Sequence, residues 1–322
     1  MSNESAWIAG LTRRLPGPPP GQVWIGDDAA VVGAPAGLLL LAADTLVEGV
    51  HADLGLTTPA DLGWKALAVN VSDLAAMGGS PLHALVTVVV PPGRGADLDG
   101  LYEGLEQAAR MLGCPIVGGD LSGGPALVVT VAVTGTVADG GPGPVLRSGA
   151  RPGDHLVVTG PLGAAAAGLR ALRAEAGKSL PASGDSALGS PSSEEVASAV
   201  DAHRRPMPRT AHGTAARHAG ASAMMDLSDG LAMDLRRLGE ASGVRAVLNE
   251  VPVAPGATFD EAIAGGDDYE LLIAVPDPDR LEEGFRSAGL PPPVLIGRCT
   301  SERGDYRLGG GELPSGGWDH RW

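Results

Sequence analysis

TPADLGWKALAVNVSDLAAMGG, residues 58–79, encodes a helix whose apolar side chains point in almost every direction. Thr58 and Pro59 are typical of a helix start, because a hydroxyl can cap the free amides and proline fits the first turn. A pair of glycines ends the pattern. A helix that is apolar all round is buried, so this one is expected inside a core. Asp73 within it is costly there unless it is paired or bound to a ligand.

Aliphatic segments surround this helix and predict strands on both sides of it. An amphipathic helix with leucines at helical spacing is expected over 98–112. The expected strands of the first half cover 23–25, 38–43, 83–90, 116–120 and 126–137. The stretch 138–153, rich in glycine and proline, then marks a boundary. We therefore expect two domains of mixed α+β or α/β organisation, an N-terminal one over 1–140 and a C-terminal one over 141–322.

The composition is that of a soluble globular protein with an excess of acidic residues. Of 322 residues, 44% are apolar and 19% are charged, and the formal net charge is −15. Nucleic acids and anionic membranes would be repelled, so neither is expected as a partner. An anionic substrate remains compatible if divalent cations intervene. No run approaches 18 apolar residues, and Cys114 and Cys299 fit no metal or redox spacing, so a cytoplasmic protein with two reduced thiols is expected.

Motifs of other nucleotide and metal sites are weak. The triplet GKS at 177–179 lacks the first glycine of a phosphate-binding P-loop, since Leu172 stands in that position. No GxGxxG follows a predicted strand, so a dinucleotide-binding fold has no fingerprint here. The histidines lack the HxxxH spacing of a zinc helix.

Aspartates recur beside glycines or at the ends of apolar runs, in six separate places. Residues at strand ends are held by the sheet while their carboxylates face the crevice where ligands commonly bind. Ser228 and Asp229 are expected at a helix start, where free amides favour anions. Each acid alone could be a turn residue or a cap, but together they favour hard cations and the phosphates that such cations bridge. These acids are Asp27 and Asp28, Asp44, Asp73, Asp120, Asp226, Asp229, and Asp268 or its neighbour Asp267.

Several segments resemble the bacterial thiamine-monophosphate kinases, a family of the aminoimidazole ribonucleotide synthetase-like superfamily. They occur in the family's order and cover nearly the whole chain. The aspartate framework is shared across the superfamily, whereas ADTLVEGVH, LRSGARPGD and GWDH point to the thiamine-monophosphate branch. The matching segments are IGDDAAVV (25–32), ADTLVEGVH (43–51), WKALAVNVSDLAAMG (64–78), IVGGD (116–120), LRSGARPGD (146–154), MDLSDGLAMDL (225–235), GGDDYELL (265–272) and GWDH (317–320).

This resemblance implies a fold, a partner and a reaction. The implied fold has an N-terminal α/β domain that binds ATP and Mg²⁺ and pairs with its dimer mate through a shared β-barrel, followed by a C-terminal α/β domain. A homodimer is therefore expected, with an active site between the domains to which the dimer partner contributes. The implied reaction converts ATP and thiamine monophosphate into ADP and thiamine diphosphate, and depends on several Mg²⁺ ions.

The resemblance also implies roles for individual residues. Asp44, Asp120 and Arg147 are expected to be catalytic. The chain departs from the family at Ala42-Ala43, where a frequent Ser-Thr is replaced and only backbone carbonyls can bind metal, and at Asp267, which replaces the usual Glu. Family positions that bind metal match Asp28, Asp44, Asp73, Asp120, Asp226 and Asp229; those that contact ATP match Gly119, Asp120, Arg147 and Ser228; those that contact substrate match His51, Asp267 and Trp318.

The expected chemistry is direct in-line transfer of the γ-phosphoryl group to a phosphate oxygen. Such a nucleophile is already deprotonated near neutral pH, so no general base is required, and bound Mg²⁺ would offset the repulsion between two anions. Arg147 can add a forked contact to phosphate oxygens, and Trp318 can face the cationic thiazolium or the pyrimidine ring. Three alternatives remain: another ATP-dependent synthetase of the superfamily, a metal-dependent phosphohydrolase, and a non-catalytic module that binds Mg-nucleotide.

Overall fold

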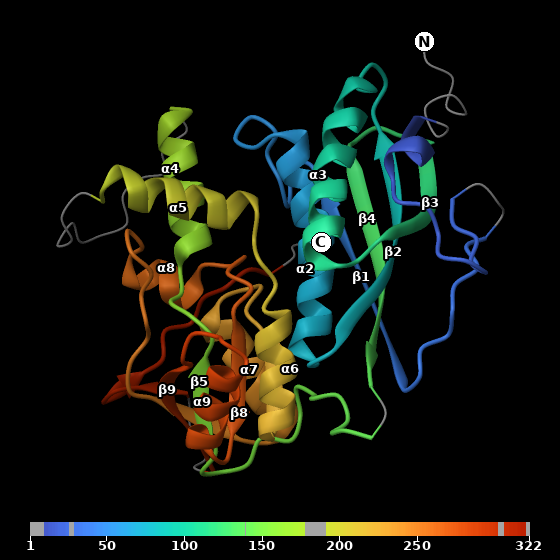
Figure 1. The fold of residues 1–322 in the computed structure, drawn as a ribbon. Helices are drawn as coiled ribbons and strands as arrows, with labels where there is room; N and C mark the ends of the chain where they lie inside the picture. The colour runs from blue at the N-terminus through green and yellow to red at the C-terminus, as the bar shows by residue number, and fades with distance from the viewer. Residues whose placement is uncertain (1–9, 26–28, 139, 178–190, 302–305, 320–322) are drawn as a thin grey trace. The chain divides into compact units, whose positions relative to one another are not determined.

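The computed structural model describes residues 10–25, 29–138, 140–177, 191–301 and 306–319. Asp27 and Asp28 lie outside the described residues. The chain divides into two compact units (Figure 1). Unit 1 comprises Met1–Leu74 and Ser80–Asp139, and unit 2 comprises Ala75–Gly79 and Gly140–Trp322.

Unit 1 contains a four-stranded sheet in the order β1-β4-β2-β3, with antiparallel pairs except for the parallel pair β2–β3. Two helices, α2 and α3, cover one face of this sheet (Figure 1). The predicted buried helix is confirmed as α2, in which Leu67 and Val71 have no exposed surface. The elements are β1 (Leu38–Val47), α2 (Pro59–Ala76), β2 (Ser80–Val90), α3 (Ala96–Leu112), β3 (Ile116–Gly123) and β4 (Val128–Val137).

Helices α2 and α3 pack closely because each offers a glycine where they meet. A Cβ on Gly63 would lie 2.0 Å from the carbonyl oxygen of Leu101. A Cβ on Gly104 would lie 1.8 Å from the carbonyl oxygen of Ala60. Any side chain at either position would separate the two helices and leave the core beneath them unfilled.

The opposite face of the unit 1 sheet is open and partly apolar. Leu39, Leu41 and Leu85 are 50%, 72% and 47% exposed. Thr45 and Thr130 also lie on this face, where their hydroxyls hydrogen-bond to each other at 2.9 Å. The described strands form an open sheet, so the barrel implied by the resemblance is not closed within one unit.

Two strands extend further than the sequence indicated. Asp44 and Asp120 were expected to close their strands, but β1 continues to Val47 and β3 to Gly123. The expectation was wrong because β4 pairs with every residue of β1, and β2 pairs with the glycine-rich end of β3. Neighbouring strands therefore override the weak strand propensity of glycine there.

Unit 2 contains a seven-stranded sheet in the order β11-β10-β7-β9-β5-β8-β6, in which only the pair β10–β7 is parallel. The two units thus give the mixed α and β organisation that the sequence predicts. The strands are β5 (His155–Val158), β6 (Ala223–Asp226), β7 (Arg245–Leu248), β8 (Leu271–Val275), β9 (Val294–Thr300), β10 (Arg307–Leu308) and β11 (Gly311–Glu312). The helices are α4 (Ala164–Glu175), α5 (Ser193–Arg204), α6 (Thr210–Ala219), α7 (Leu231–Ser242), α8 (Phe259–Ala264) and α9 (Pro278–Ser287).

Strand β8, which lies between β5 and the edge strand β6, is buried on both faces. Leu272 and Ala274 join a core that contains α7 and α8, whereas Leu271 and Ile273 join a second core with α6 and α9. A strand covered on both sides reads as a continuous apolar run, as here. Among the helices that the structure describes, none has the length and apolar character needed to cross a membrane.

Candidate active site

In unit 1, Asp44 and Asp73 are brought to one side of α2. The backbone N–H of Asp44 donates to Oδ1 of Asn70 at 2.8 Å, and the Asn70 amide in turn donates to the carbonyl of Ala66 at 2.8 Å. Asn70 and Asp73 are three residues apart, so they share a face of the helix. Asn70 is fully buried. The Asn70 side chain therefore fixes the position of Asp44 along α2, the helix that also carries Asp73.

Gly119 and Asp120 lie on the edge strand β3. A Cβ on Gly119 would lie 1.8 Å from the carbonyl oxygen of Val86, and its φ is +154°, so only glycine fits. Ser122 donates from Oγ to Oδ2 of Asp120 at 2.9 Å. Burial, and secondly the negative charge of Asp120, raise the pKa of Tyr102 to about 12. The ring of Tyr102 therefore stays neutral close to this carboxylate.

Unit 1 does not bring Asp44 and Asp120 together. The two residues lie on the opposite edge strands β1 and β3, three strand spacings apart, which is about 14 Å in a flat sheet. Asp44 pairs with Val131, which is buried under the helices. Asp120 pairs with Thr87, which belongs to the alternate, open face. One sheet therefore presents these two carboxylates in different directions.

His51 lies in the turn that follows β1. Its Nδ1 accepts a hydrogen bond from the backbone N–H of Val47 at 3.0 Å, which fixes the ring against the turn with Nδ1 unprotonated. Arg94 binds both carboxylate oxygens of Glu48, at 2.9 and 2.6 Å, and also Asp97 at 2.6 Å. This ion-pair network ties the turn to the start of α3.

In unit 2, four of the predicted residues converge around the loop after β6. Asp267 donates its backbone N–H to the carbonyl of Ser228 at 2.8 Å, and Trp318 donates its own to the carbonyl of Asp229 at 3.0 Å. Asp226, buried at the end of β6, begins this loop. The segments 226–230, 265–269 and 316–318 therefore form one site, which we call the DGL loop site.

The backbone of the DGL loop site is strained at two positions. Asp267 and Tyr269 have φ values of 69° and 51°, and no other described residue except glycine has a positive φ. Such conformations cost about 1–3 kcal/mol each and persist where surrounding contacts impose them. The Tyr269 hydroxyl donates to Oδ1 of Asp267 at 3.1 Å. Gly266 leaves no room for a side chain, because a Cβ there would lie 2.6 Å from the carbonyl oxygen of Ser228.

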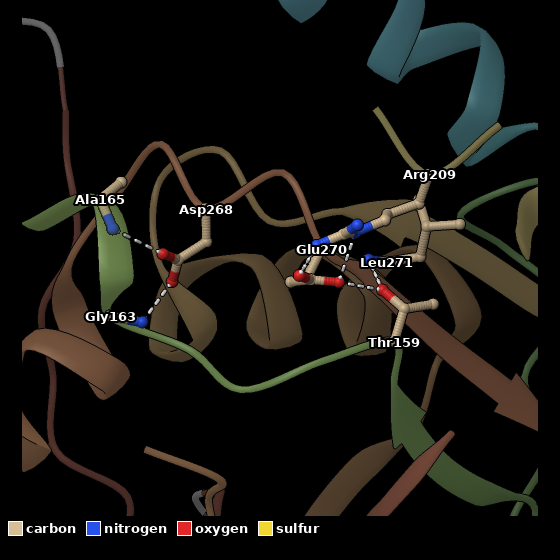
Figure 2. A network of polar contacts seen from close by, with 7 residues as sticks. All are labelled: Thr159, Gly163, Ala165, Arg209, Asp268, Glu270 and Leu271. Atoms are coloured by element: carbon tan, nitrogen blue, oxygen red, sulfur yellow. Dashed lines mark hydrogen bonds and ion pairs between the residues drawn. The ribbon is translucent and has the colours of Figure 1, made fainter. Parts of the chain in front are cut away.

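Two neighbouring acids anchor this strained segment from the other side (Figure 2). Asp268 accepts the backbone N–H groups of Gly163 at 2.6 Å and Ala165 at 3.2 Å, so it caps the start of α4. Glu270 accepts from both Arg209 and the hydroxyl of Thr159. Asp267 and Tyr269 thus contact the DGL loop site and each other. Asp268 and Glu270 instead bind other parts of unit 2.

Burial raises the pKa of Asp268 to about 7, and the charges of Glu270 and Asp267 add to this effect, although the two backbone N–H groups oppose it. The sequence pattern named Asp268 or its neighbour Asp267, without a choice between the two. The structure separates their roles, because Asp267 contacts the loop of Ser228 and Asp268 caps a helix.

Asp234 and Arg237 also belong to the DGL loop site, and sequence reasoning missed both. Asp234 is completely buried and accepts the backbone N–H of Asp229 at 3.0 Å. Arg237 contacts the carboxylates of both Asp229 and Asp234, the latter at 2.8 Å. Burial first, and the charges of Asp229 and Asp226, raise the pKa of Asp234 to about 6. Their signal in the sequence was an acid and a base three residues apart on the helix after Asp229.

Arg147 lies elsewhere in unit 2. Its carbonyl accepts a hydrogen bond from the hydroxyl of Ser242, the last residue of α7. Asp229 precedes the other end of this helix, which is about 18 Å long. The structure therefore does not gather the backbone of Arg147 into the DGL loop site.

The donor set of the site suits a hard divalent cation, although no complete metal cage is formed. Among the described residues, no three or more His, Cys, Asp or Glu side chains are grouped so that they could hold a metal ion. The DGL loop site nevertheless pairs two carboxylates, those of Asp229 and Asp234, with Arg237. Carboxylate and carbonyl oxygens of this kind are the ligands that Mg²⁺ takes, together with waters and substrate phosphates.

Two family models match the chain. The N-terminal domain of AIR synthase related proteins matches residues 26–137, and the C-terminal domain of the same proteins matches residues 151–308. The fold and the site therefore define the class of this protein as AIR synthase-related.

Similar proteins narrow this class. The chain is 37% identical to the thiamine-monophosphate kinase of Bacillus subtilis over 264 residues, which covers 79% of this chain and 77% of that protein. It is 31% identical to the crystal structure of thiamine-monophosphate kinase from Stenotrophomonas maltophilia K279a, with a TM-score of 0.77 over 96% of both chains. A structure described as AaThiL complexed with AMPPCP and TMP is 30% identical, with a TM-score of 0.73 over 99% of this chain and 97% of that one. The chain belongs to the thiamine-monophosphate kinase family.

Proposed function

We propose that this protein transfers the γ-phosphoryl group of ATP to thiamine monophosphate and so forms thiamine diphosphate. The observation that carries this proposal is the convergence of Ser228, Asp229, Asp267 and Trp318 in the DGL loop site. These segments are remote in sequence, and their contacts maintain strained backbone at Asp267, as is common at functional sites. Relatives that share this chain's fold at about 30% identity include a complex with an ATP analogue and TMP.

The described residues of unit 2 are proposed to bind and orient the reactants. Ser228 and the start of α7 would hold nucleotide phosphates, as loop and helix starts commonly do. Asp267 would contact the substrate, and the exposed ring of Trp318 would cover its cationic thiazolium or its pyrimidine. Arg147 would add a forked contact to phosphate oxygens.

The carboxylates are proposed to hold several Mg²⁺ ions: Asp44, Asp73 and Asp120 from unit 1, and Asp226 and Asp229 from unit 2, with Asp28 from outside the described residues. When bound, Mg²⁺ would neutralise the charge that develops on the transferring group. The phosphate of the substrate is itself the nucleophile, so no side chain is required to remove a proton.

We further propose that the active protein is a homodimer joined through the open face of the unit 1 sheet, where two such sheets would complete a barrel. Exposed leucines on that face, including Leu41, support this arrangement. The separation of Asp44 and Asp120 supports it as well, because a second copy could bring its Asp120 towards the Asp44 of the first.

Mixed dimers test this arrangement. Neither Asp44→Asn nor Asp120→Asn alone should be active. If each site draws one acid from each copy, a mixture of the two variants should regain up to about a quarter of the wild-type activity, because half of its dimers are mixed and each has one intact site. A mixture as inactive as its parents, with mixed dimers shown by mass spectrometry, would contradict a shared site.

The assay that tests the reaction is ADP release with and without thiamine monophosphate, followed by identification of the product. We expect ADP and thiamine diphosphate in equal amounts, and no release after chelation of Mg²⁺. Release of ADP and phosphate without an acceptor would instead indicate a phosphohydrolase. ATP binding without turnover would indicate a non-catalytic module, and turnover only with another acceptor would indicate another synthetase of the superfamily.

The buried, free thiols of Cys114 and Cys299 support a cytoplasmic location.

A further inference from the structure

Asp229 is held by three of its four polar atoms. Its backbone N–H donates to Oδ2 of Asp234 at 3.0 Å, and its carbonyl accepts the N–H of Trp318 at 3.0 Å. Its Oδ2 accepts from Nη1 of Arg237. Its other carboxylate oxygen, Oδ1, makes no hydrogen bond or ion pair with any residue that the structure describes.

Arg237 is fixed in turn by Asp234. That side chain is completely buried and uses both oxygens, Oδ1 for Arg237 at 2.8 Å and Oδ2 for the Asp229 amide. A buried carboxylate is stable only when it is paired and hydrogen-bonded. The three residues therefore depend on one another: Asp234 holds the loop and the arginine, and the arginine holds the carboxylate of Asp229.

We propose that Asp234 and Arg237 are positioning residues that preset Oδ1 of Asp229 as a ligand for a divalent cation. This inference rests on the proposed role of Asp229 in metal binding. A carboxylate that gives one oxygen to an outer partner and the other to a metal has its orientation fixed before the metal arrives. Removing such outer partners typically lowers metal affinity about 10- to 100-fold.

Charge alone makes the opposite prediction. Arg237 is a cation beside the proposed ligand, so its removal would leave the acids around Asp229 more negative and would strengthen cation binding by simple electrostatics. The direction in which the metal affinity changes when Arg237 is removed therefore distinguishes the two explanations. Weaker binding indicates that Arg237 positions the carboxylate of Asp229, and tighter binding indicates that it only neutralises that carboxylate.

The test measures binding of Mn²⁺, without nucleotide, from the electron paramagnetic resonance signal of the free ion. Asp229→Asn should remove one class of Mn²⁺ sites. Arg237→Gln and Asp234→Asn should weaken the same class about 10- to 100-fold, and should raise the Mg²⁺ concentration needed for half-maximal ADP release in the same proportion. Arg237→Lys keeps the charge but not the planar guanidinium, and should recover part of the loss.

Arg286→Gln is the matched control. Arg286 makes an ion pair with Glu283 three residues away at 2.6 Å, the same spacing as Arg237 and Asp234, but on the exposed face of α9. Its loss should leave Mn²⁺ binding unchanged. If Arg237→Gln or Asp234→Asn fails to fold, Arg237→Lys alone carries the test, and it should weaken Mn²⁺ binding several-fold with an unchanged melting temperature.

Unchanged or tighter Mn²⁺ binding by the folded Arg237 variants, with the Asp229-dependent sites lost in Asp229→Asn, would overturn the positioning role and leave the proposed reaction intact. If Asp229→Asn binds Mn²⁺ like the wild type, Asp229 is not a ligand and the inference falls with that assignment. Absence of thiamine diphosphate with all Mn²⁺ results as expected would overturn the proposed reaction alone.

Discussion

Units 1 and 2 hold their acidic residues in different ways. In unit 1, Asp44 and Asp120 lie within regular strands, where the ladder and the buried helix α2 set their positions. In unit 2, Asp229 and Asp267 lie on irregular loops, where Arg237 and two left-handed residues set the geometry. A sheet fixes a side chain through its neighbours' backbones, whereas a loop needs dedicated polar partners. The difference predicts which changes each unit tolerates.

The largest expected effect comes from the acids of the unit 1 sheet. Asp44→Asn and Asp120→Asn should each lower turnover by roughly a thousandfold, about 4 kcal/mol in the barrier. The melting temperature should change little, because the strands that carry both residues remain paired. ADP release and circular dichroism measure the two quantities.

Asp99→Asn serves as the control in the same unit, since Asp99 is 71% exposed in a long surface ion pair with Arg14. It should keep wild-type turnover. Turnover like the wild type in Asp44→Asn would remove that residue from the mechanism.

Two glycines compare the rigidity of sheet and loop. Gly119→Ala would place Cβ 1.8 Å from the Val86 carbonyl oxygen within the β2–β3 ladder, and Gly266→Ala would place it 2.6 Å from the Ser228 carbonyl oxygen in the loop. Gly119→Ala should destabilise the protein by about 3 kcal/mol or more. Gly266→Ala should destabilise it less but raise the KM for thiamine monophosphate, because the loop can shift. Denaturant unfolding measures the loss of stability in each variant, and steady-state kinetics measures the KM. Equal losses of stability in the two variants would contradict the comparison.

Substitution of Trp318 tests how far the DGL loop site of unit 2 controls substrate binding. Trp318→Ala should raise the KM for thiamine monophosphate roughly 2- to 30-fold, the equivalent of about 0.5–2 kcal/mol for a lost cation–π contact. Trp318→Phe keeps a ring and should lose less. The KM for ATP should stay constant in both variants, and a change confined to ATP would place this ring at the nucleotide instead.

The smallest expected effect concerns pH and Asp268. Its folded-state pKa of about 7 lies above the ordinary value of 3.8, so between these values the folded chain retains a proton that the unfolded chain has released. Stability should therefore fall as pH rises from about 4 to about 7. Asp268→Asn should reduce this slope while still accepting a backbone N–H at the start of α4. Melting temperatures across this range measure the slope, and an identical slope in the variant would assign it to other groups.

Some elements were predictable because their signal is local. The helix α2 was expected from its cap, its glycine end and its apolar surface, and the structure confirms it. The ends of β1 and β3 were not, since pairing with β4 and β2 extends both strands past the aspartates. The roles proposed for all the site residues, those of Asp28, Arg147 and His51 among them, remain predictions.

The DGL loop site shows the same division. Its acids and Trp318 could be selected from sequence motifs, but nothing in the sequence indicates that Asp268 caps α4 or that Asp234 binds the amide of Asp229. Those contacts join residues through the tertiary fold, and the partner of each acid depends on which loops meet.

The amino-acid sequence alone determined the family, the kinds of side chain available for phosphate and metal chemistry, and the buried helix, because each is written in short-range patterns. Only the tertiary structure decided which carboxylates share a site and which oxygen of Asp229 stays available. Backbone pairing and left-handed turns set those directions, and they arise from contacts between segments far apart in the chain.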